Sequence, residues 1–494
     1  MSSSKQKSRS SLDLNSVCGP IHLRVVNHEL TTVATGTESL KVELPAGEYQ
    51  VEMGLGEWRE TRSLTLQPGE AHRDHQLSMD FPTAFPVGRL DDWESTQLQA
   101  VSTLSHEPAQ QLGSGGGLLV FARYLDAEEV RKPATLSGME LWSGDGVRIM
   151  ELADAQRQES AAGWAGTYLE VRPGAYRLRW YERRLSRWSD DELIQQEQAV
   201  WISPDWVTGF FFHVSPYDGR PNMTGMSVHM RRVGEGFEGY AGDEERRQNL
   251  ASELALESLR SGEPFGMVQR EILELILHAK YQDPMLGIVG AYALLGERQQ
   301  RWSVFDTVVR NLFKILSGHP DVRALRWLGK LMREGEDKTH TRSDALAWPP
   351  MIYDGCMGVL ERSWDEENVV VRNSLLEQLG PHLQHRGPWT AWEVFYEEPM
   401  SLSSEFGDTG GKTRGLEDNP TTVLNRVWQE LDEASLRKFE PEAWGSAEYQ
   451  VGRFIAQRKS VKDSRVTFAD LRETGLSRDL VTQALRRLEK KLQY

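Results

Sequence analysis

The chain has 494 residues, of which 39% are hydrophobic and 26% charged, and its formal net charge is −16 at pH 7. This length is enough for three or four domains, and the apolar content allows each of them to bury a core. The acidic balance argues against a protein that binds nucleic acid or anionic membranes with its whole surface, so such a role would need a local basic patch.

The N-terminal residues carry no secretory signal. The stretch "MSSSKQKSRSS" lacks an apolar segment, and we expect residues 1–15 to form a short disordered tail. No run approaches 18 apolar residues, so neither a transmembrane helix nor a membrane partner is expected. Two cysteines, Cys18 and Cys356, argue against a disulfide scaffold and favour a cytoplasmic location.

A strand–turn–strand pattern occurs twice in the first half of the chain. Residues 42–53 read "VELPAGEYQVEM" and residues 169–180 read "LEVRPGAYRLRW". In each copy an alternating strand leads into a Pro/Gly turn, and the second strand opens on a tyrosine, Tyr49 or Tyr176. Alternation with period 2 between closely spaced turns is typical of all-β sandwiches.

We therefore predict two small antiparallel β-sandwiches, over 16–82 and 115–216, with a linker over 83–114. The pattern L-P-A-G-x-Y-x-V resembles carboxypeptidase-regulatory-like and other prealbumin-like sandwiches. That resemblance implies a fold and no activity, because the same fold serves many functions. A non-catalytic spacer or interaction module is expected, and a ligand-binding sandwich is the alternative.

The second half of the chain has a helical pattern. Residues 217–247 are rich in glycine and charge and predict a second linker, and residues 248–400 predict an α-helical domain. Within it, "DPMLGIVGAYALL" begins with Asp283 as a helix cap and Pro284 at the first helical position. Gly287, Gly290 and Ala291 give this apolar helix a small-residue face, which indicates close packing in the core. A cofactor or lipid groove is the alternative.

Three motifs follow one another in this domain: "DPMLGIVGAYALL", "HPDVRAL" and "WPPMIYDGCMGVLERSW". In this order they resemble an uncharacterised bacterial family over roughly residues 265–395. Members of that family accompany caspase-like or CHAT-type peptidases in defence and signalling systems. The resemblance implies a protein partner of that class and brings no catalytic residues with it.

The other candidate motifs indicate no catalytic, cofactor or metal site. Cys356 in "YDGCMG" has no recognisable histidine base, and we expect a buried structural cysteine. His382 and His385 have the spacing of a metal pair, but no further ligand completes a site, so solvated or helix-end histidines are expected.

A flexible loop is expected over residues 401–420. It contains "GDTGGKT", in which the first glycine of a phosphate-binding loop is one place out of position and no apolar strand precedes it. Lys412 and Arg414 in this loop are candidate positions for proteolytic cleavage.

The C-terminal region, residues 421–494, is predicted to be helical and to end in a helix-turn-helix over 466–494. A first helix ends at Gly475, and Ser477 caps a second. The stretch resembles the winged-helix domains of bacterial regulators. Residues 453–494 hold eleven Lys/Arg and five Asp/Glu, an excess of six positive charges that suits phosphate binding.

The second of these helices carries the candidate binding residues. In the helix-turn-helix mode, Arg478 lies at its N-terminus, Thr482 and Gln483 face base edges, and Arg486 and Arg487 face the DNA backbone. Small winged-helix units also serve in protein contacts, and both interpretations stay open.

The sequence therefore indicates a multidomain α+β protein. The first hypothesis is a non-enzymatic adaptor, regulator or proteolytic substrate of a bacterial caspase-like or CHAT peptidase system that acts through protein–protein contacts. The alternative is a DNA-binding transcriptional regulator that uses its C-terminus. A third hypothesis, an enzyme, has Cys356 as its only candidate nucleophile.

Overall fold

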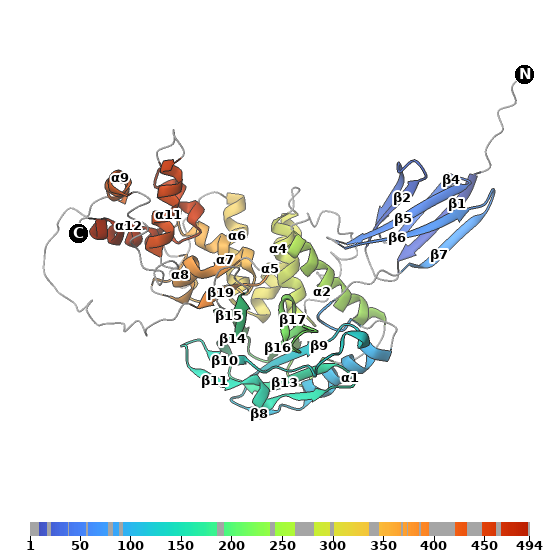
Figure 1. The fold of residues 1–494 in the computed structure, drawn as a ribbon, viewed down its shortest axis with the longest axis horizontal. Helices are drawn as coiled ribbons and strands as arrows, with labels where there is room; N and C mark the ends of the chain where they lie inside the picture. Colours follow the sequence, from blue (N-terminus) through green and yellow to red (C-terminus); the bar gives the residue numbers. More distant parts are fainter. Residues whose placement is uncertain are drawn as a thin grey trace, which may run out of the picture. The chain divides into compact units, whose positions relative to one another are not determined.

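The structure is a computed structural model and describes residues 9–16, 21–37, 39–55, 58–77, 83–87, 92–184, 192–237, 243–261, 281–296, 301–334, 345–366, 369–372, 374–384, 387–394, 420–431, 447–460 and 466–492. These residues form several β-sheets and, in the second half, mainly helices (Figure 1). The mixed α+β class is therefore confirmed. The chain divides into two compact units. Unit 1 comprises residues 1–137, 151–174 and 202–317, and unit 2 comprises residues 138–150, 175–201 and 318–494.

The first seven strands form one sheet path at the N-terminal end of unit 1, in the order β6-β5-β2-β3-β4-β1-β7. They are β1 (Arg9–Ser16), β2 (His22–Asn27), β3 (Thr32–Thr37), β4 (Ser39–Pro45), β5 (Gly47–Leu55), β6 (Trp58–Leu66) and β7 (Ala71–Leu77). β3 and β4 pair only at Thr37 and Ser39, so the path falls into two strand groups. Both groups contribute to one hydrophobic core, which includes the fully buried Leu12, Val25 and Met53.

Strand β1 corrects the expected N-terminal tail. Residues 9–15, which we predicted to be disordered, pair with β4 in antiparallel and with β7 in parallel register. Leu12 and Leu14 are buried and alternate with more exposed polar neighbours. The serine-rich composition concealed this short strand, because its partners lie far along the chain and give no local signal.

Both copies of the strand–turn–strand repeat are confirmed, and each joins strands that do not pair with one another. β4 leads into β5, which belongs to the other strand group, and β13 leads into β14, which belongs to another sheet. In the first turn, the buried Tyr49 donates its hydroxyl hydrogen to the Pro45 carbonyl at 2.7 Å. In the second turn, Gly174 has φ of +145°, a conformation that favours glycine. The repeat thus marks a change of strand group or sheet rather than a hairpin.

A second sheet of unit 1 has the order β12-β13-β9-β16-β17, with β8 beside β13. Its elements and the helices of this unit are β8 (Gln110–Gln111), β9 (Gly116–Arg123), β12 (Arg157–Glu159), β13 (Trp164–Val171), β16 (Trp206–Val214), β17 (Pro221–Arg232), α1 (Asp92–His106), α2 (Asp243–Ser261), α4 (Pro284–Leu295) and α5 (Trp302–Ile315). β9 is buried along its whole length. A continuously apolar strand is expected where both faces of a sheet are covered.

Both predicted linkers contain regular structure. The segment 83–114 holds α1, whose Leu98, Val101 and Leu104 pack into the core of the second sheet. The segment 217–247 holds β17 and the first residues of α2. Their polar and glycine-rich composition suggested linkers. The few apolar residues in each segment are nevertheless buried in or against the second sheet of unit 1.

Helix α4 confirms the local prediction for the Asp-Pro-Met motif. The Asp283 side chain accepts a hydrogen bond from the Met285 amide at 3.0 Å, and Pro284 occupies the first turn. Every residue of α4 is buried, and the helix packs against α2, α5 and β17. The helix therefore belongs to the core of unit 1, as its apolar composition predicted.

The sheet of unit 2 has the order β11-β10-β14-β15-β19-β18. Its strands are β10 (Met139–Ser143), β11 (Arg148–Glu151), β14 (Gly174–Arg184), β15 (Glu192–Ile202), β18 (Leu383–Gln384) and β19 (Ala391–Val394). β18 and β19 lie within 248–400, where only helices were expected. β19 pairs with β15, and the Trp392 indole donates to the Glu197 carboxylate at 2.9 Å. A four-residue strand is too short to show alternation, so only this pairing reveals it.

The remaining described elements of unit 2 are helical: α6 (Pro320–Glu334), α7 (Tyr353–Arg362), α8 (Leu375–Leu379), the 3₁₀ helix η5 (Gly380–His382), α9 (Pro420–Glu430), α11 (Ala447–Ser460), the 3₁₀ helix η7 (Ala469–Thr474) and α12 (Arg478–Leu492). Gly318 lies between α5 and α6 in the chain, and Pro320 is the first residue of α6. Among the described helices, none is both long and apolar enough to cross a membrane.

Candidate functional site

Helix α12, which carries the predicted binding residues, begins where the sequence indicated. Gly475 has φ of +73°, and this left-handed conformation ends the preceding helix. The Ser477 hydroxyl accepts a hydrogen bond from the Leu480 amide at 3.2 Å and caps α12. The preceding element is a six-residue 3₁₀ helix, η7, instead of the expected α-helix.

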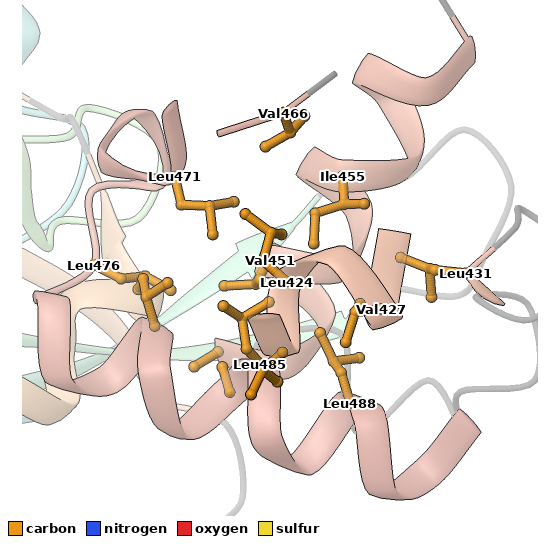
Figure 2. Close-up of a cluster of buried hydrophobic side chains, with 14 of the residues drawn as sticks. Leu424, Val427, Leu431, Val451, Ile455, Val466, Leu471, Leu476, Leu485 and Leu488 are labelled. Carbon is orange, nitrogen blue, oxygen red and sulfur yellow. The ribbon is translucent and has the colours of Figure 1, made fainter. Parts of the chain in front are cut away.

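One face of α12 is fixed in the core of the C-terminal helices. Val481, Leu485 and Leu488 are fully buried, together with side chains of α9 and α11 (Figure 2). Because residues three and four apart share a helix face, this packing leaves the opposite face of α12 outside the core.

The N-terminal end of α12 is occupied by contacts within unit 2. Trp364 follows α7 in the chain, and its indole N–H donates to the Leu476 carbonyl at 2.7 Å. The Ser477 hydroxyl lies 3.4 Å from the Glu377 carboxylate of α8. Leu476 is 0% exposed and Ser477 is 2% exposed. Leu476 and Ser477, the two residues that lead into α12, therefore offer no surface to a ligand.

Arg478 and Thr482, two of the predicted binding residues, make contacts inside the unit. The Arg478 guanidinium donates to the Trp364 carbonyl at 3.3 Å. The Thr482 hydroxyl donates to the Arg478 carbonyl one turn earlier, at 2.9 Å. The Arg478 bond joins residues 114 positions apart, so the local sequence pattern did not reveal it.

The other three predicted residues lie farther along α12. Gln483 is half-buried, and Arg486 is exposed. Arg487 is also exposed, and its guanidinium pairs with the Glu448 carboxylate of α11 at 2.9 Å. Arg486 and Lys490 are exposed and four residues apart on α12, and within the described part of the chain neither of them pairs with an acidic residue. They form the open basic surface of α12.

Much of the positive excess around α12 is matched by acidic neighbours. The ion pairs join Arg458 to Glu473, Arg472 to Asp365 and Arg426 to Glu489. The count of basic residues in the sequence therefore overstates the positive charge at the surface of this region. Lys412 and Arg414, the predicted cleavage positions, lie outside the described residues.

The second and third motifs of the helical domain meet at a buried carboxylate. Asp321 of "HPDV" is 0% exposed and accepts hydrogen bonds from the Met351 and Ile352 amides at 2.8 and 3.0 Å. The Asp321 amide donates to Nδ1 of His319 at 3.3 Å. The spacing between "HPDV" and "PPM" thus reflects a structural joint between α6 and the segment before α7.

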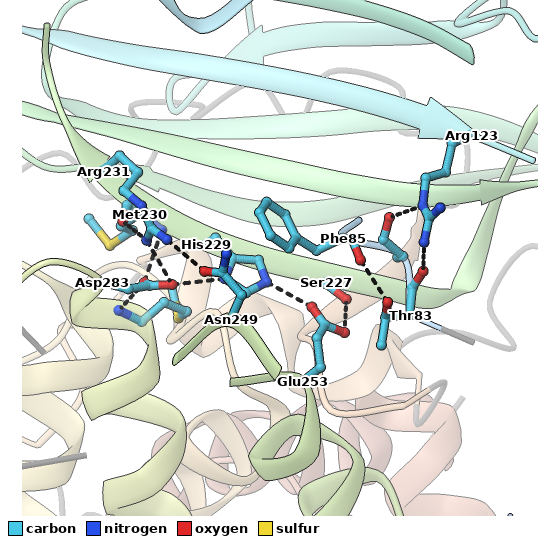
Figure 3. A network of polar contacts seen from close by, with 12 residues as sticks. Thr83, Phe85, Arg123, Ser227, His229, Met230, Arg231, Asn249, Glu253 and Asp283 are labelled. Atoms are coloured by element: carbon cyan, nitrogen blue, oxygen red, sulfur yellow. Dashed lines mark hydrogen bonds and ion pairs between the residues drawn. The ribbon is translucent and has the colours of Figure 1, made fainter. Parts of the chain in front are cut away.

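The first motif contributes to a buried ionic network in unit 1 (Figure 3). His229 of β17 lies between two carboxylates: its Nδ1 is 2.8 Å from Asp283, and its Nε2 is 2.7 Å from Glu253 of α2. Arg231 pairs with Asp283 at 3.2 Å and donates to Asn249 at 2.8 Å. Each of these side chains is at least nine-tenths buried.

The remaining hydrogen bonds of the network satisfy both carboxylates. The Ser227 hydroxyl donates to the second Glu253 oxygen at 2.7 Å. The Met230 and Met285 amides both donate to Asp283 at 3.0 Å. Asp283 therefore acts as a helix cap, an ion-pair partner and an acceptor for β17 at the same time.

The pKa values follow from this arrangement. Burial by itself lowers the pKa of His229, but hydrogen bonds and charge from Asp283 and Glu253 outweigh it and raise the pKa to about 8. Burial alone would raise the pKa of Asp283, yet His229 and Arg231 hold it below its usual value. His229 is therefore largely protonated at neutral pH.

Sequence reasoning recognised Asp283 only as a helix cap and missed His229 and Glu253. The three residues lie on separate elements, and His229 sits in a strand of otherwise ordinary composition. The only local signal was a histidine and an arginine two residues apart in "VHMR", which places both on one face of a strand.

Of the other reactive side chains, Cys356 and His319 are buried, and His382 is half-buried. Cys356 is 0% exposed, which confirms the expected buried cysteine, and burial raises the pKa of its thiol far above its ordinary value. Burial lowers the pKa of His319 to about 3 and lowers that of His382. His385 lies outside the described residues. Within the described residues, no group of three or more His, Cys, Asp and Glu has the geometry of a metal site.

Comparisons with known proteins find limited similarity. No family model matches the chain. The chain is 32% identical over 88 residues to the imidazole glycerol phosphate synthase subunit HisF of Leuconostoc mesenteroides, which covers 16% of this chain and 35% of that protein. The chain thus spans about a third of that relative. Among solved structures, the Bacillus anthracis TIE protein aligns at a TM-score of 0.16 and 11% identity, over 40% of this chain and 32% of that one.

Proposed function

We propose that this chain is a non-enzymatic interaction protein, an adaptor, regulator or proteolytic substrate that works beside a caspase-like or CHAT peptidase in a bacterial defence or signalling system. The observation that carries the proposal is the packing at the start of α12. Leu476 and Ser477, which lead into the helix, are buried against Trp364 and Glu377, whereas Arg486 and Lys490 are exposed. Arg478 is also exposed, but its guanidinium bonds to the Trp364 carbonyl. The link to a peptidase rests on the resemblance of the three helical motifs.

The packing of α12 favours a protein partner over duplex DNA. A recognition helix in the helix-turn-helix mode places its N-terminal residues in the major groove. Here Ser477 is buried, Arg478 bonds to the Trp364 carbonyl, and the Glu377 carboxylate beside them would repel a phosphate. Arg486 and Lys490, which remain exposed, suit an acidic surface on a partner protein.

The burial of the reactive side chains supports a non-enzymatic role. A nucleophilic cysteine needs access and a lowered thiol pKa, whereas Cys356 has neither. His229 is enclosed by Glu253 and Asp283 on both ring nitrogens, so it offers no free nitrogen to a substrate. We interpret residues 9–77 as a prealbumin-like β-sandwich that serves as a spacer or interaction module in the cytoplasm.

The test uses the full chain and a purified caspase-like or CHAT peptidase from the same host. Binding and cleavage are compared for the wild type, for Arg486→Glu with Lys490→Glu, and for a control with Arg131→Glu and Arg220→Glu. The control changes the net charge equally at exposed positions of unit 1. We expect the α12 variant to bind at least tenfold more weakly and the control to bind as the wild type does. Equal binding of all three chains, or no binding of the wild type, would contradict the proposal.

The second candidate is a DNA-binding regulator, which the capped turn at Gly475 and Ser477 and the local positive excess favour. Fluorescence anisotropy of the full chain on duplex DNA tests it. Tight binding that falls on charge reversal at Arg486 and Arg487 would move the conclusion to DNA. Weak binding that is equal in wild type and variant would leave the protein-partner proposal in place.

A further inference from the structure

We propose that His229, Glu253 and Asp283 form a proton-dependent lock that holds helix α2 and the start of α4 on strand β17. The lock is closed while the imidazole carries its proton and is weakened when that proton leaves. It lies wholly within unit 1 and is independent of the role proposed for α12.

The geometry requires the charged form of His229. Both ring nitrogens lie within hydrogen-bond distance of a carboxylate oxygen, at 2.8 Å from Asp283 and 2.7 Å from Glu253. Only an imidazolium has two N–H groups and can donate to both carboxylates. A neutral ring presents a lone pair to one of them at the same distance, which is repulsive.

The two carboxylates belong to different helical segments, so the proton joins three elements. Glu253 lies in α2, Asp283 caps α4, and His229 lies in β17. Loss of the proton therefore weakens contacts of both helices with the same strand. The Ser227 hydroxyl still donates to Glu253, and the Met230 amide still donates to Asp283. The expected result is therefore local opening instead of global unfolding.

The groups that face His229 are few and defined. Glu253 comes from α2, Asp283 from the start of α4, and Arg231 from β17 itself. The ring of Phe85 lies 4.3 Å from the imidazole, centroid to centroid. The segment that carries Phe85 is held by Arg123 (Figure 3), which donates to the carbonyls of Thr83 and Ala84. Arg123 also pairs with Glu94.

The direction of the pH effect follows from the linkage between proton binding and stability. The pKa of His229 is raised from 6.5 to about 8, so its stabilising contribution is complete below pH 6.5 and is lost as the pH rises through 8. For an open state with an ordinary histidine, the opening constant is expected to increase about 20-fold between pH 6 and pH 9.

Amide hydrogen exchange with mass spectrometry on the full chain tests the lock. Protection of peptides from α2 and α4 is measured at pH 6, 7, 8 and 9, with the intrinsic pH dependence of exchange divided out. We expect protection in both helices to fall together by about 20-fold, centred near pH 8. Peptides from β4 and β5 serve as the internal reference.

Three variants separate the lock from a general effect of alkaline pH. His229→Gln cannot gain or lose the proton and should make protection of α2 and α4 independent of pH over this range. Glu253→Gln removes one carboxylate and should move the midpoint to lower pH. His213→Gln is the matched control, because burial lowers the pKa of His213 to about 4 and it stays neutral from pH 6 to 9.

The outcomes distinguish the proposal from its alternatives. A pH-dependent loss of protection that is abolished in His229→Gln and retained in His213→Gln supports the lock. Flat protection in the wild type overturns it. The same loss of protection in every peptide also overturns it. So does the same pH profile in the wild type and in Glu253→Gln, and this comparison replaces the one with His229→Gln if that variant does not fold.

Discussion

The buried network of unit 1 and the ion pairs around α12 use the same kinds of side chains in opposite surroundings. The side chains of His229 and Glu253 are 2% and 4% exposed. Those of Arg472 and Asp365, which form an ion pair, are 44% and 45% exposed. In the network, each carboxylate also accepts hydrogen bonds from backbone or hydroxyl groups. The exposed pair has water to complete its solvation.

This difference decides what each region does for the protein. A buried charge pays a large desolvation cost, so it persists only with complete pairing, and removal of one partner leaves the other unsolvated. An exposed pair gains little, because water and salt screen it. The network therefore holds elements together, and the exposed pairs mainly reduce the positive charge at the surface around α12.

The largest effect is expected from Asp283→Ala in the network. The change leaves the charges of His229 and Arg231 without their shared carboxylate and removes the cap of α4. We expect a loss of about 3–5 kcal/mol in the free energy of opening of α4, measured by amide exchange near neutral pH. The control is Glu235→Ala at an exposed position in the same unit. A loss below about 1 kcal/mol would show that this buried carboxylate contributes no more to stability than an exposed ion pair does.

A smaller effect is expected from Asp321→Asn in the joint between α6 and the segment before α7. The amide has one acceptor oxygen in place of two, so the Met351 and Ile352 amides can no longer both be satisfied in this geometry. We expect a loss of about 2 kcal/mol in the protection of residues 345–366. Unchanged protection there would mean that the two motifs are held together by apolar packing alone.

Trp364→Phe tests the contact that closes the N-terminal end of α12. Phenylalanine keeps an aromatic ring in the core but loses the hydrogen bond to the Leu476 carbonyl. We expect the opening free energy of α12 to fall by about 1 kcal/mol, and that of α4 to stay the same. The readout is amide exchange of peptides from both helices, and an equal change in the two would argue against a local joint.

The smallest effect is expected from Arg472→Gln, which removes the exposed pair with Asp365. The free energy of unfolding, measured by thermal denaturation, should change by less than about 0.5 kcal/mol. The change should vanish at high salt, because salt screens the pair. A loss comparable to that of Asp283→Ala would remove the distinction between the two regions.

Several local features were determined by the sequence alone. Asp283 caps α4, Ser477 caps α12, and Gly475 ends the helix before α12, as predicted. The turns of both repeats also lie where their Pro/Gly residues predict. Each of these features depends on groups within about four residues, so adjacent residue types suffice to specify it.

The tertiary structure decided the features that depend on distant residues. Strand β1 and strand β19 exist because of partners far along the chain, and the composition around each suggested a tail or a helix. Arg478 fits a DNA-contacting position by its place in the helix, but Trp364, 114 residues earlier, binds its guanidinium. His229 became a charged bridge only because Glu253 and Asp283 converge on it from two helices. Helix caps and turns are short-range interactions, whereas the pairing of a strand or of a buried charge depends on which segments the fold brings together.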